Sequence, residues 1–178
     1  MLALRARDGE PGAFAALVDA LQPRAVRFAT QMTAASGDDI DDLLQEAWIR
    51  TFKALPRYDG DRSFESWFFT ILANCCRTLR VRLRQWQRRA HPLDDQLRDA
   101  TIDPLLATST RHDVARVYSA LATLPAAQRE TFLLHHVEGF SYDEIAEITG
   151  VGVSACKMRA KRAMDAVRDR LREEFADA

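Results

Sequence analysis

Basic side chains near the C-terminus are the residues of this sequence best suited to chemistry. Between Lys157 and Arg172 the chain carries seven lysines and arginines but only two acids. At about 100° per residue these bases fall opposite an apolar stripe. Lysine and arginine bind phosphates and guanine edges, whereas methionine can only touch a thymine methyl or a sugar. The pattern predicts a DNA-binding helix, and a basic face that is merely solvated is the alternative. The stripe consists of Cys156, Ala160, Ala163, Val167 and Leu171. The candidate DNA-binding residues are Ser154, Ala155, Lys157, Met158, Arg159, Lys161 and Arg162.

The segment just before these residues has the features of a helix-turn-helix. Ser141, with Glu144 three residues later, predicts a capping box at a helix start. We expect a short helix that breaks at residues 149–151 and a second helix over residues 154–174. Two helices joined by a tight turn that contains glycine make a helix-turn-helix. The second helix of this motif places its first turns in the major groove of DNA.

A second basic helix is expected from Ser63 to Arg84. Tryptophan lies at the edge of its apolar stripe, and asparagine and arginine occupy the opposite side. Such a face could stack an unpaired base and hold phosphates. Equally, the tryptophan could lie at the rim of a core with the arginines in water, and the residues alone favour neither reading. The face consists of Trp67, Thr70, Asn74, Arg77, Arg80 and Arg84.

The segment from Asp38 to Glu46 is a surface of the opposite kind, with five acids and no base. It would repel DNA, so we expect it to face a basic protein partner or solvent. Acids at a helix start also favour the helix dipole, and that account is sufficient by itself.

Helices are the elements that must position these residues. The chain of 178 residues is 47% apolar and holds only seven glycines and six prolines, which favours long helices over a loop-rich β protein. The apolar period of a helix is found over residues 14–21, 40–55, 63–84, 113–124 and 126–138. The period fades over residues 85–111. We therefore predict an all-α fold of two small helical domains, at residues 1–86 and 112–178, joined by a flexible linker at 87–111.

Several classes of protein are disfavoured by the sequence. Three cysteines, two of them adjacent, give neither a disulfide framework nor a metal-ligand spacing. No apolar run approaches the ~18 residues needed to span a bilayer, and the N-terminus does not resemble a secretory signal. We expect a cytoplasmic protein without membrane insertion, metal or cofactor. No arrangement of nucleophile and base indicates an enzyme, and His135 and His136 are neighbours that should point to different sides of a helix.

Four stretches of the sequence resemble one known family. Residues 41–48 (DDLLQEAW) and 64–74 (FESWFFTILAN) are similar to region 2 of sigma factors. Residues 124–130 (LPAAQRE) and 139–146 (GFSYDEIA) are similar to region 4. The combination, with a short linker and no other region, resembles the extracytoplasmic-function (ECF) group of the sigma-70 family. It covers nearly the whole chain, in the right order and spacing. The expected domains are thus a region 2 helical bundle and a region 4 helix-turn-helix.

The resemblance implies partners and roles. The acidic helix would dock on the clamp helices of the β′ subunit of core RNA polymerase, while the β flap would contact the helix-turn-helix domain. The linker would thread toward the active-site channel, and an anti-sigma factor would hold the protein inactive. The implied polymerase-binding residues are Asp42, Leu43, Gln45, Glu46, Trp48 and Arg50.

The resemblance also implies two promoter surfaces. The basic helix and the connection before it would open the minus-ten element and hold an extruded base. The helix-turn-helix, with the candidate residues named above, would read the minus-thirty-five element as duplex. The implied minus-ten residues are Arg57, Asp61, Arg62, Ser63, Trp67, Asn74, Arg77, Arg80 and Arg84.

The chain departs from the family pattern at a few positions. Ala155 and Met158 lack hydroxyls that the family often has, which suggests an altered promoter preference. Thr78 stands where an acidic residue is common. Cys75 and Cys156 lie in phase with the apolar stripes, which favours packing, and a redox role for Cys76 is a minor alternative.

Two other functions remain open at this point. The chain could be a stand-alone helix-turn-helix transcriptional regulator with an N-terminal dimerisation or sensor domain, which would bind a palindromic duplex without polymerase. It could also be a helical protein–protein module whose basic faces are only solvated.

Overall fold

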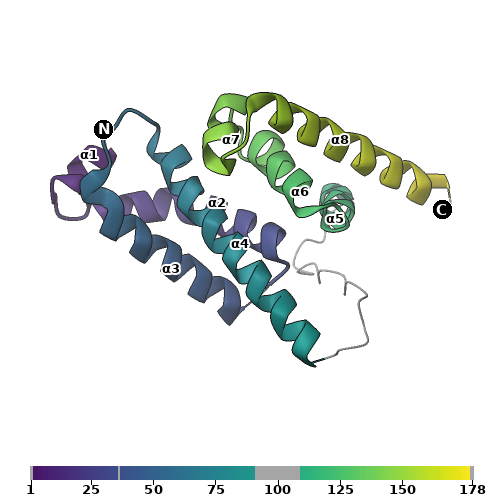
Figure 1. Cartoon of the computed structure of the whole chain (residues 1–178), viewed down its shortest axis with the longest axis horizontal. Coiled ribbons are helices and arrows are strands. Elements are labelled where there is room, and N and C mark those ends of the chain that lie inside the picture. The colour runs from purple at the N-terminus through teal and green to yellow at the C-terminus, as the bar shows by residue number, and fades with distance from the viewer. Residues whose placement is uncertain (1, 36, 91–108, 177–178) are drawn as a thin grey trace. The chain divides into compact units, whose positions relative to one another are not determined.

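The structure is a computed structural model that describes residues 2–35, 37–90 and 109–176. Every regular element in these ranges is a helix, so the predicted all-α fold is confirmed (Figure 1). The chain divides into two compact units, the first built mainly on α1 to α4 and the second on α5 to α8. We describe each unit by itself.

The first unit is a bundle in which α2, α3 and α4 pack on one another and α1 packs on α2. Its centre is rich in aromatic rings, and Phe28, Phe68 and Phe69 are at most 1% exposed. The ring of Phe69 meets those of Phe28 and Phe68 edge to face, with centroids 5.3 and 5.7 Å apart, and such contacts stabilise a core beyond the area that they bury. The elements are α1 (Leu2–Arg7), α2 (Ala13–Thr33), α3 (Asp38–Ala54), the 3-10 turn η1 (Leu55–Arg57) and α4 (Phe64–Ala90).

Helix α2 continues well beyond the apolar period that the sequence shows, and it passes through Pro23. Proline removes one backbone hydrogen bond from a helix interior. The helix persists because core residues lie on both sides of the proline: Leu21 is 4% exposed and Ala25 is fully buried. Tertiary packing therefore outweighs the local preference here.

Helix α4 begins at the predicted place, where the amide of Ser66 donates to Oγ of Ser63 at 3.1 Å. It ends at Ala90 rather than near Arg84. Arginine and glutamine are good helix formers, so the helix can continue after its apolar stripe ends. Both ends of the predicted linker, residues 87–90 and 109–111, are helical. The rest of it, residues 91–108, lies outside the described residues.

In the second unit α8 packs against α5 and α6. The predicted helix over residues 126–138 is present, but its second half is a π turn in which the amide of Glu138 donates to the carbonyl of Leu133 at 2.9 Å. The guanidinium of Arg129 donates to the carbonyls of Ala122 and Leu124 and so satisfies the end of α5. The elements are α5 (Ser109–Ala122), α6 (Ala126–Phe132), the π turn η2 (Leu133–Val137), α7 (Tyr142–Thr149) and α8 (Val153–Ala176).

Candidate polymerase and nucleic-acid interfaces

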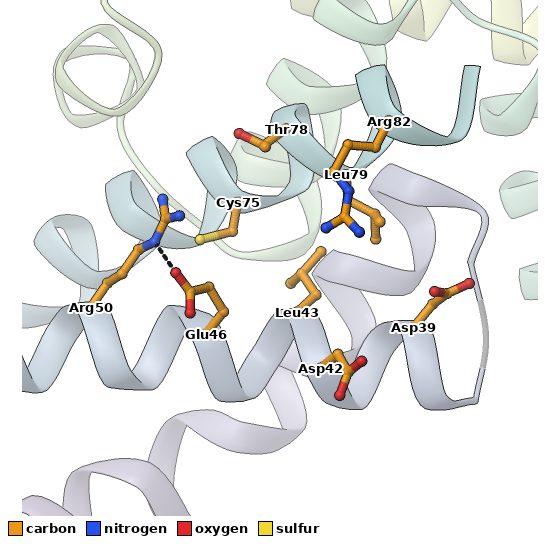
Figure 2. A pocket seen from close by; sticks show the side chains of 9 residues that line it. All are labelled: Asp39, Asp42, Leu43, Glu46, Arg50, Cys75, Thr78, Leu79 and Arg82. Atoms are coloured by element: carbon orange, nitrogen blue, oxygen red, sulfur yellow. Dashed lines mark hydrogen bonds and ion pairs between the residues drawn. The ribbon is translucent and has the colours of Figure 1, made fainter. Parts of the chain in front are cut away.

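The outward face of α3 carries four of the six residues implied for polymerase binding. Asp42, Gln45, Glu46 and Arg50 are all exposed. Nε of Arg50 donates to Oε1 of Glu46 at 2.6 Å, one helical turn away (Figure 2). The first turn of the helix is acidic, as expected. The face therefore offers charge of both signs, with acid dominant toward its N-terminus.

Leu43 and Trp48, the other two residues implied for polymerase binding, lie inside the bundle. Leu43 is 6% exposed and Trp48 is 8% exposed. The indole of Trp48 stacks on Phe68, with ring centroids 4.1 Å apart, and its Nε1 donates to Oε1 of Gln22 at 2.6 Å. These contacts hold α3 against α2 and α4. The small exposed part of Leu43 lines a cleft beside α4, and that of Trp48 lines a groove beside α2.

Two apolar residues on the same face were missed by the sequence reasoning. Ile49 is 40% exposed and Phe52 is 59% exposed. With Phe14 and Val18 of α2 they line a groove of about 380 Å³. The rings of Phe14 and Phe52 meet edge to face at 5.1 Å. The available signal was that both residues fall out of phase with the core stripe of α3.

A smaller cleft of about 130 Å³ lies between α3 and α4 (Figure 2). Its α3 side carries Asp39, Asp42 and Glu46, and its α4 side includes Cys75 and Arg82. Burial raises the pKa of the Cys75 thiol, and Arg50 opposes this shift. All three cysteines are buried, as expected for Cys75 and Cys156; Cys76 is fully buried as well, which disfavours a redox role.

The connection before α4 is held by its own side chains. The hydroxyl of Tyr58 donates to the carbonyl of Arg62 at 2.6 Å, and burial raises the pKa of this phenol. The implied minus-ten residues Arg57, Asp61, Arg62 and Ser63 are all exposed, and Ser63 also caps α4 as described above. The connection is thus ordered while its side chains reach solvent.

An aromatic cluster supports Trp67 at the start of α4. Its ring centroid lies 5.2 Å from that of Tyr58 and 5.6 Å from that of Phe64. Trp67 is half-buried, so one part of the indole is packed and another part is accessible. This geometry suits a platform that is fixed before a base arrives.

The polar face of α4 continues from Trp67 toward the C-terminus of the helix. Asn74 is exposed, and its Oδ1 accepts from Nη1 of Arg77 at 2.7 Å. Arg80 is half-buried and Arg84 is exposed. The structure therefore places the tryptophan, the asparagine and the arginines on one helix, in the order expected from the sequence.

The helix-turn-helix expected from the sequence is present. Oγ of Ser141 accepts from the amide of Glu144 at 3.2 Å, and Oε2 of Glu144 accepts from the amide of Ser141 at 2.9 Å, so the capping box is confirmed. Gly150 ends α7 with φ of 72°, a left-handed conformation that glycine adopts without strain. The capping box therefore fixes the start of α7, and Gly150 makes the turn that leads to α8.

The two faces of α8 divide as expected. Cys156, Ala160, Ala163 and Val167 are at most 4% exposed, whereas Leu171 is half-buried. Of the candidate duplex-binding residues only Arg159 is half-buried; the exposed ones are Ser154, Ala155, Lys157, Met158, Lys161 and Arg162. The accessible surface of the N-terminal half of α8 is therefore largely cationic.

Among the described residues, no group of three or more His, Cys, Asp or Glu side chains could hold a metal ion. No helix in the described ranges is long and apolar enough to cross a membrane.

The fold and the helix-turn-helix define a helical protein of the DNA-binding class. The family model "Sigma-70 region 2" matches residues 17–101, and "Sigma-70, region 4" matches residues 115–167. Together these matches cover most of the chain. It therefore belongs to the sigma-70 family.

Curated relatives give the same result. RNA polymerase sigma factor NccH of Alcaligenes xylosoxydans xylosoxydans is 32% identical over 91% of this chain and 88% of its own length. ECF RNA polymerase sigma factor SigC of Mycobacterium tuberculosis is 31% identical over 93% of this chain and 87% of its own length. The protein is an RNA polymerase sigma factor of the ECF type, which binds core polymerase and directs it to promoter DNA. These relatives therefore favour an ECF sigma factor over a stand-alone helix-turn-helix regulator.

Solved structures agree with the fold. CnrH in complex with the cytosolic domain of CnrY matches with a TM-score of 0.71 and 28% identity, over 99% of this chain and 97% of that chain. RpoE from Bartonella quintana, in complex with the anti-sigma factor NepR, matches with a TM-score of 0.73 and 24% identity, over 90% of this chain and 98% of that chain. The second likeness supports the fold alone.

Proposed function

We propose that this sigma factor uses three separate surfaces, one for each of three binding functions. The outward face of α3 binds core polymerase, residues 57–63 with the polar face of α4 hold the minus-ten element, and the N-terminal half of α8 reads the minus-thirty-five element. The segregation of charge carries the proposal. The first turn of α3 holds three acids, whereas the polar faces of α4 and α8 expose bases. Only the basic surfaces suit phosphates.

Core polymerase binds α3 through an apolar centre with a charged rim. Ile49 and Phe52 supply exposed apolar area of the kind that dominates binding energy in protein interfaces. Asp42, Glu46 and Arg50 form the charged rim on the side toward α4, where they line the neighbouring cleft, and they select a partner of complementary charge. The β′ clamp helices are the partner that the family resemblance implies. Leu43 and Trp48 act from the core by holding the helix in place.

The minus-ten element is opened and then held at Trp67. Unpairing and unstacking a base costs a few kcal/mol. Stacking on an aromatic side chain returns about 1–3 kcal/mol per base, so a prepared platform offsets much of that cost. Asn74 can bond a base edge, while Arg77, Arg80 and Arg84 follow the phosphates.

The minus-thirty-five element is read by α8. Lys157, Arg159, Lys161 and Arg162 supply phosphate and guanine contacts. Met158 is 49% exposed and can make only apolar contacts, so a thymine methyl is its natural partner. Ala155 and Met158 both lack the hydroxyl that the family often has at these positions. We therefore expect a promoter preference that differs from that of relatives with those hydroxyls.

We further propose the partners and the setting. The β flap contacts the second unit, and an anti-sigma protein covers the polymerase-binding face; the family resemblance supports both, and the relative CnrH was solved with the cytosolic domain of CnrY. The protein is not an enzyme, and it works in the cytoplasm, where polymerase and promoter DNA meet. Residues 1–86, 87–111 and 112–178 serve as region 2, linker and region 4.

Transcription by core polymerase and the purified chain on a promoter library tests this function. We expect the wild-type chain to bind core polymerase and to select promoters. The pair Asp42→Lys and Glu46→Lys should abolish core binding, because it reverses the charge of the rim on α3. Failure of the wild-type chain to bind core polymerase would contradict the proposal.

A matched control separates a lost interface from a changed net charge. Asp8 and Asp19 are exposed acids elsewhere in the first unit. The pair Asp8→Lys and Asp19→Lys makes the same change of charge and should leave core binding intact. Equal losses in both pairs would mean that overall charge, rather than the face of α3, governs binding.

A further inference from the structure

Three side chains form a stack that joins η2, α7 and α8. The imidazole of His135 lies on the ring of Tyr142, with centroids 4.2 Å apart and 28° between the ring planes. Nζ of Lys157 lies 5.9 Å from the centroid of the same tyrosine ring. At distances up to about 6 Å an ammonium is attracted to the face of an aromatic ring. The lysine of α8 is therefore in contact range of a ring supplied by α7.

The tyrosine ring is held by contacts that need no DNA. Nδ1 of His135 lies 2.9 Å from the carbonyl oxygen of Phe140, and since a carbonyl only accepts, Nδ1 carries the proton and donates it. This bond sets the plane of the imidazole that supports Tyr142. Tyr142 is also the first residue of α7, directly after the capping box at Ser141. The ring is thus fixed from its backbone and from one face.

Lys157 benefits from such support because of its own flexibility. A lysine has a four-carbon stem, and fixing it at a phosphate costs rotamer entropy. Lys157 is exposed in the second turn of α8. In a helix-turn-helix the first helix crosses the DNA backbone while the start of the second enters the groove. A contact between Tyr142 and Lys157 therefore joins the two helices that approach the DNA.

We propose that Tyr142, held by His135, is a positioning residue that orients Lys157 toward a phosphate of the duplex. The inference rests on the proposed role of α8 in reading the minus-thirty-five element. Tyr142 acts through Lys157, so its contribution should disappear when the lysine is absent.

The test uses holoenzyme made from the full chain and core polymerase, on a duplex promoter that the wild-type holoenzyme selects from a random library. Tyr142→Leu should weaken binding about two- to fivefold, the range of an exposed cation–π contact. It should also flatten the dependence of affinity on salt, by up to about one phosphate contact. Tyr142→Phe keeps the ring and should behave as the wild type.

A double-mutant cycle shows whether Tyr142 acts through Lys157. In a Lys157→Ala background, Tyr142→Leu should have no further effect on binding. In a Lys161→Ala background, which removes a different exposed lysine of α8, Tyr142→Leu should retain its full effect. Equal losses in the two backgrounds, or no loss from Tyr142→Leu alone, would overturn the proposal. Wild-type binding by Lys157→Ala alone would overturn this proposal, whereas wild-type binding by Arg162→Ala as well would overturn the proposed role of α8.

A measurement on the free wild-type chain covers the case in which Tyr142→Leu does not fold. The ring of Tyr142 should shift the side-chain methylene protons of Lys157 upfield in the NMR spectrum. Tyr142→Phe should preserve that shift. Methylene resonances at the position of an unstructured lysine would overturn the proposal without any variant.

Discussion

The two surfaces proposed to bind DNA differ in how strongly their side chains are preorganised in the absence of DNA. On α4, Trp67 packs against Tyr58 and Phe64, and Asn74 is bonded to Arg77. On α8 the candidate residues are mostly exposed, and the one contact described for Lys157 is to a ring of α7. An unpaired base needs a rigid platform that replaces its lost stacking. A duplex keeps its own shape and needs mainly cations at its phosphates.

The largest effect is expected at the platform. Trp67→Ala should slow promoter opening by about 10- to 100-fold, because it removes stacking worth about 1–3 kcal/mol. Permanganate reactivity of thymines in the minus-ten element measures the opening. Trp86 is 68% exposed on the same helix, so Trp86→Ala is the matched control and should open DNA normally. Similar defects in both variants would remove the special role of the platform.

A smaller effect is expected on the cationic surface. Arg162→Ala should weaken duplex binding by about tenfold and reduce the slope of log affinity against log salt by about one, because one phosphate or guanine contact is lost. Filter binding of holoenzyme at several salt concentrations measures both. A normal salt slope together with weaker binding would instead mean that α8 has shifted as a whole.

Removing the cap of α7 tests how much the second unit relies on local structure. Ser141→Ala should lower the free energy of unfolding by about 1 kcal/mol, since the amide of Glu144 loses its acceptor. Thermal unfolding followed by circular dichroism measures the change. Ser119 is exposed on α5, and Ser119→Ala should leave stability unchanged. An unaltered Ser141→Ala protein would show that the capping box does not fix this unit.

The smallest effect concerns the cleft beside the polymerase-binding face. The raised pKa of Cys75 means that less thiolate is present at a given pH, so alkylation should be slower than in the unfolded chain at the same pH and should speed up as pH rises. Mass spectrometry of iodoacetamide-treated protein measures the rate. Bound core polymerase should cover the cleft and lower the alkylation rate of Cys75 further. Alkylation of Cys75 at the rate of the unfolded chain would contradict the burial described here.

Features with a local cause were predictable from the sequence. The capping box depends on two residues three apart, and the stripe of α8 follows from the helical period, so both could be predicted correctly. The extent of α2 could not, because packing on both sides of Pro23 decides it. The π turn of η2 could not be predicted either. Its hydrogen bonds reach back five residues instead of four, and tertiary contacts decide between these two patterns.

At the candidate site, exposure could be predicted for the polar residues and less well for the apolar ones. The family motif names Leu43 and Trp48 beside Asp42 and Glu46, but a motif does not distinguish core from surface. Ile49 and Phe52 carry no motif, and only the fold shows that they are exposed next to Phe14. The role of each residue thus depends on which face of α3 the bundle covers.

Footprinting of one promoter with saturating holoenzyme tests most directly whether the two DNA surfaces do different work. We predict that Arg162→Ala, once saturated, opens the minus-ten element as the wild type does. Trp67→Ala should protect the upstream duplex yet leave the minus-ten thymines unreactive to permanganate. Normal opening by Trp67→Ala, or a closed complex with saturating Arg162→Ala, would contradict the division of work between α4 and α8.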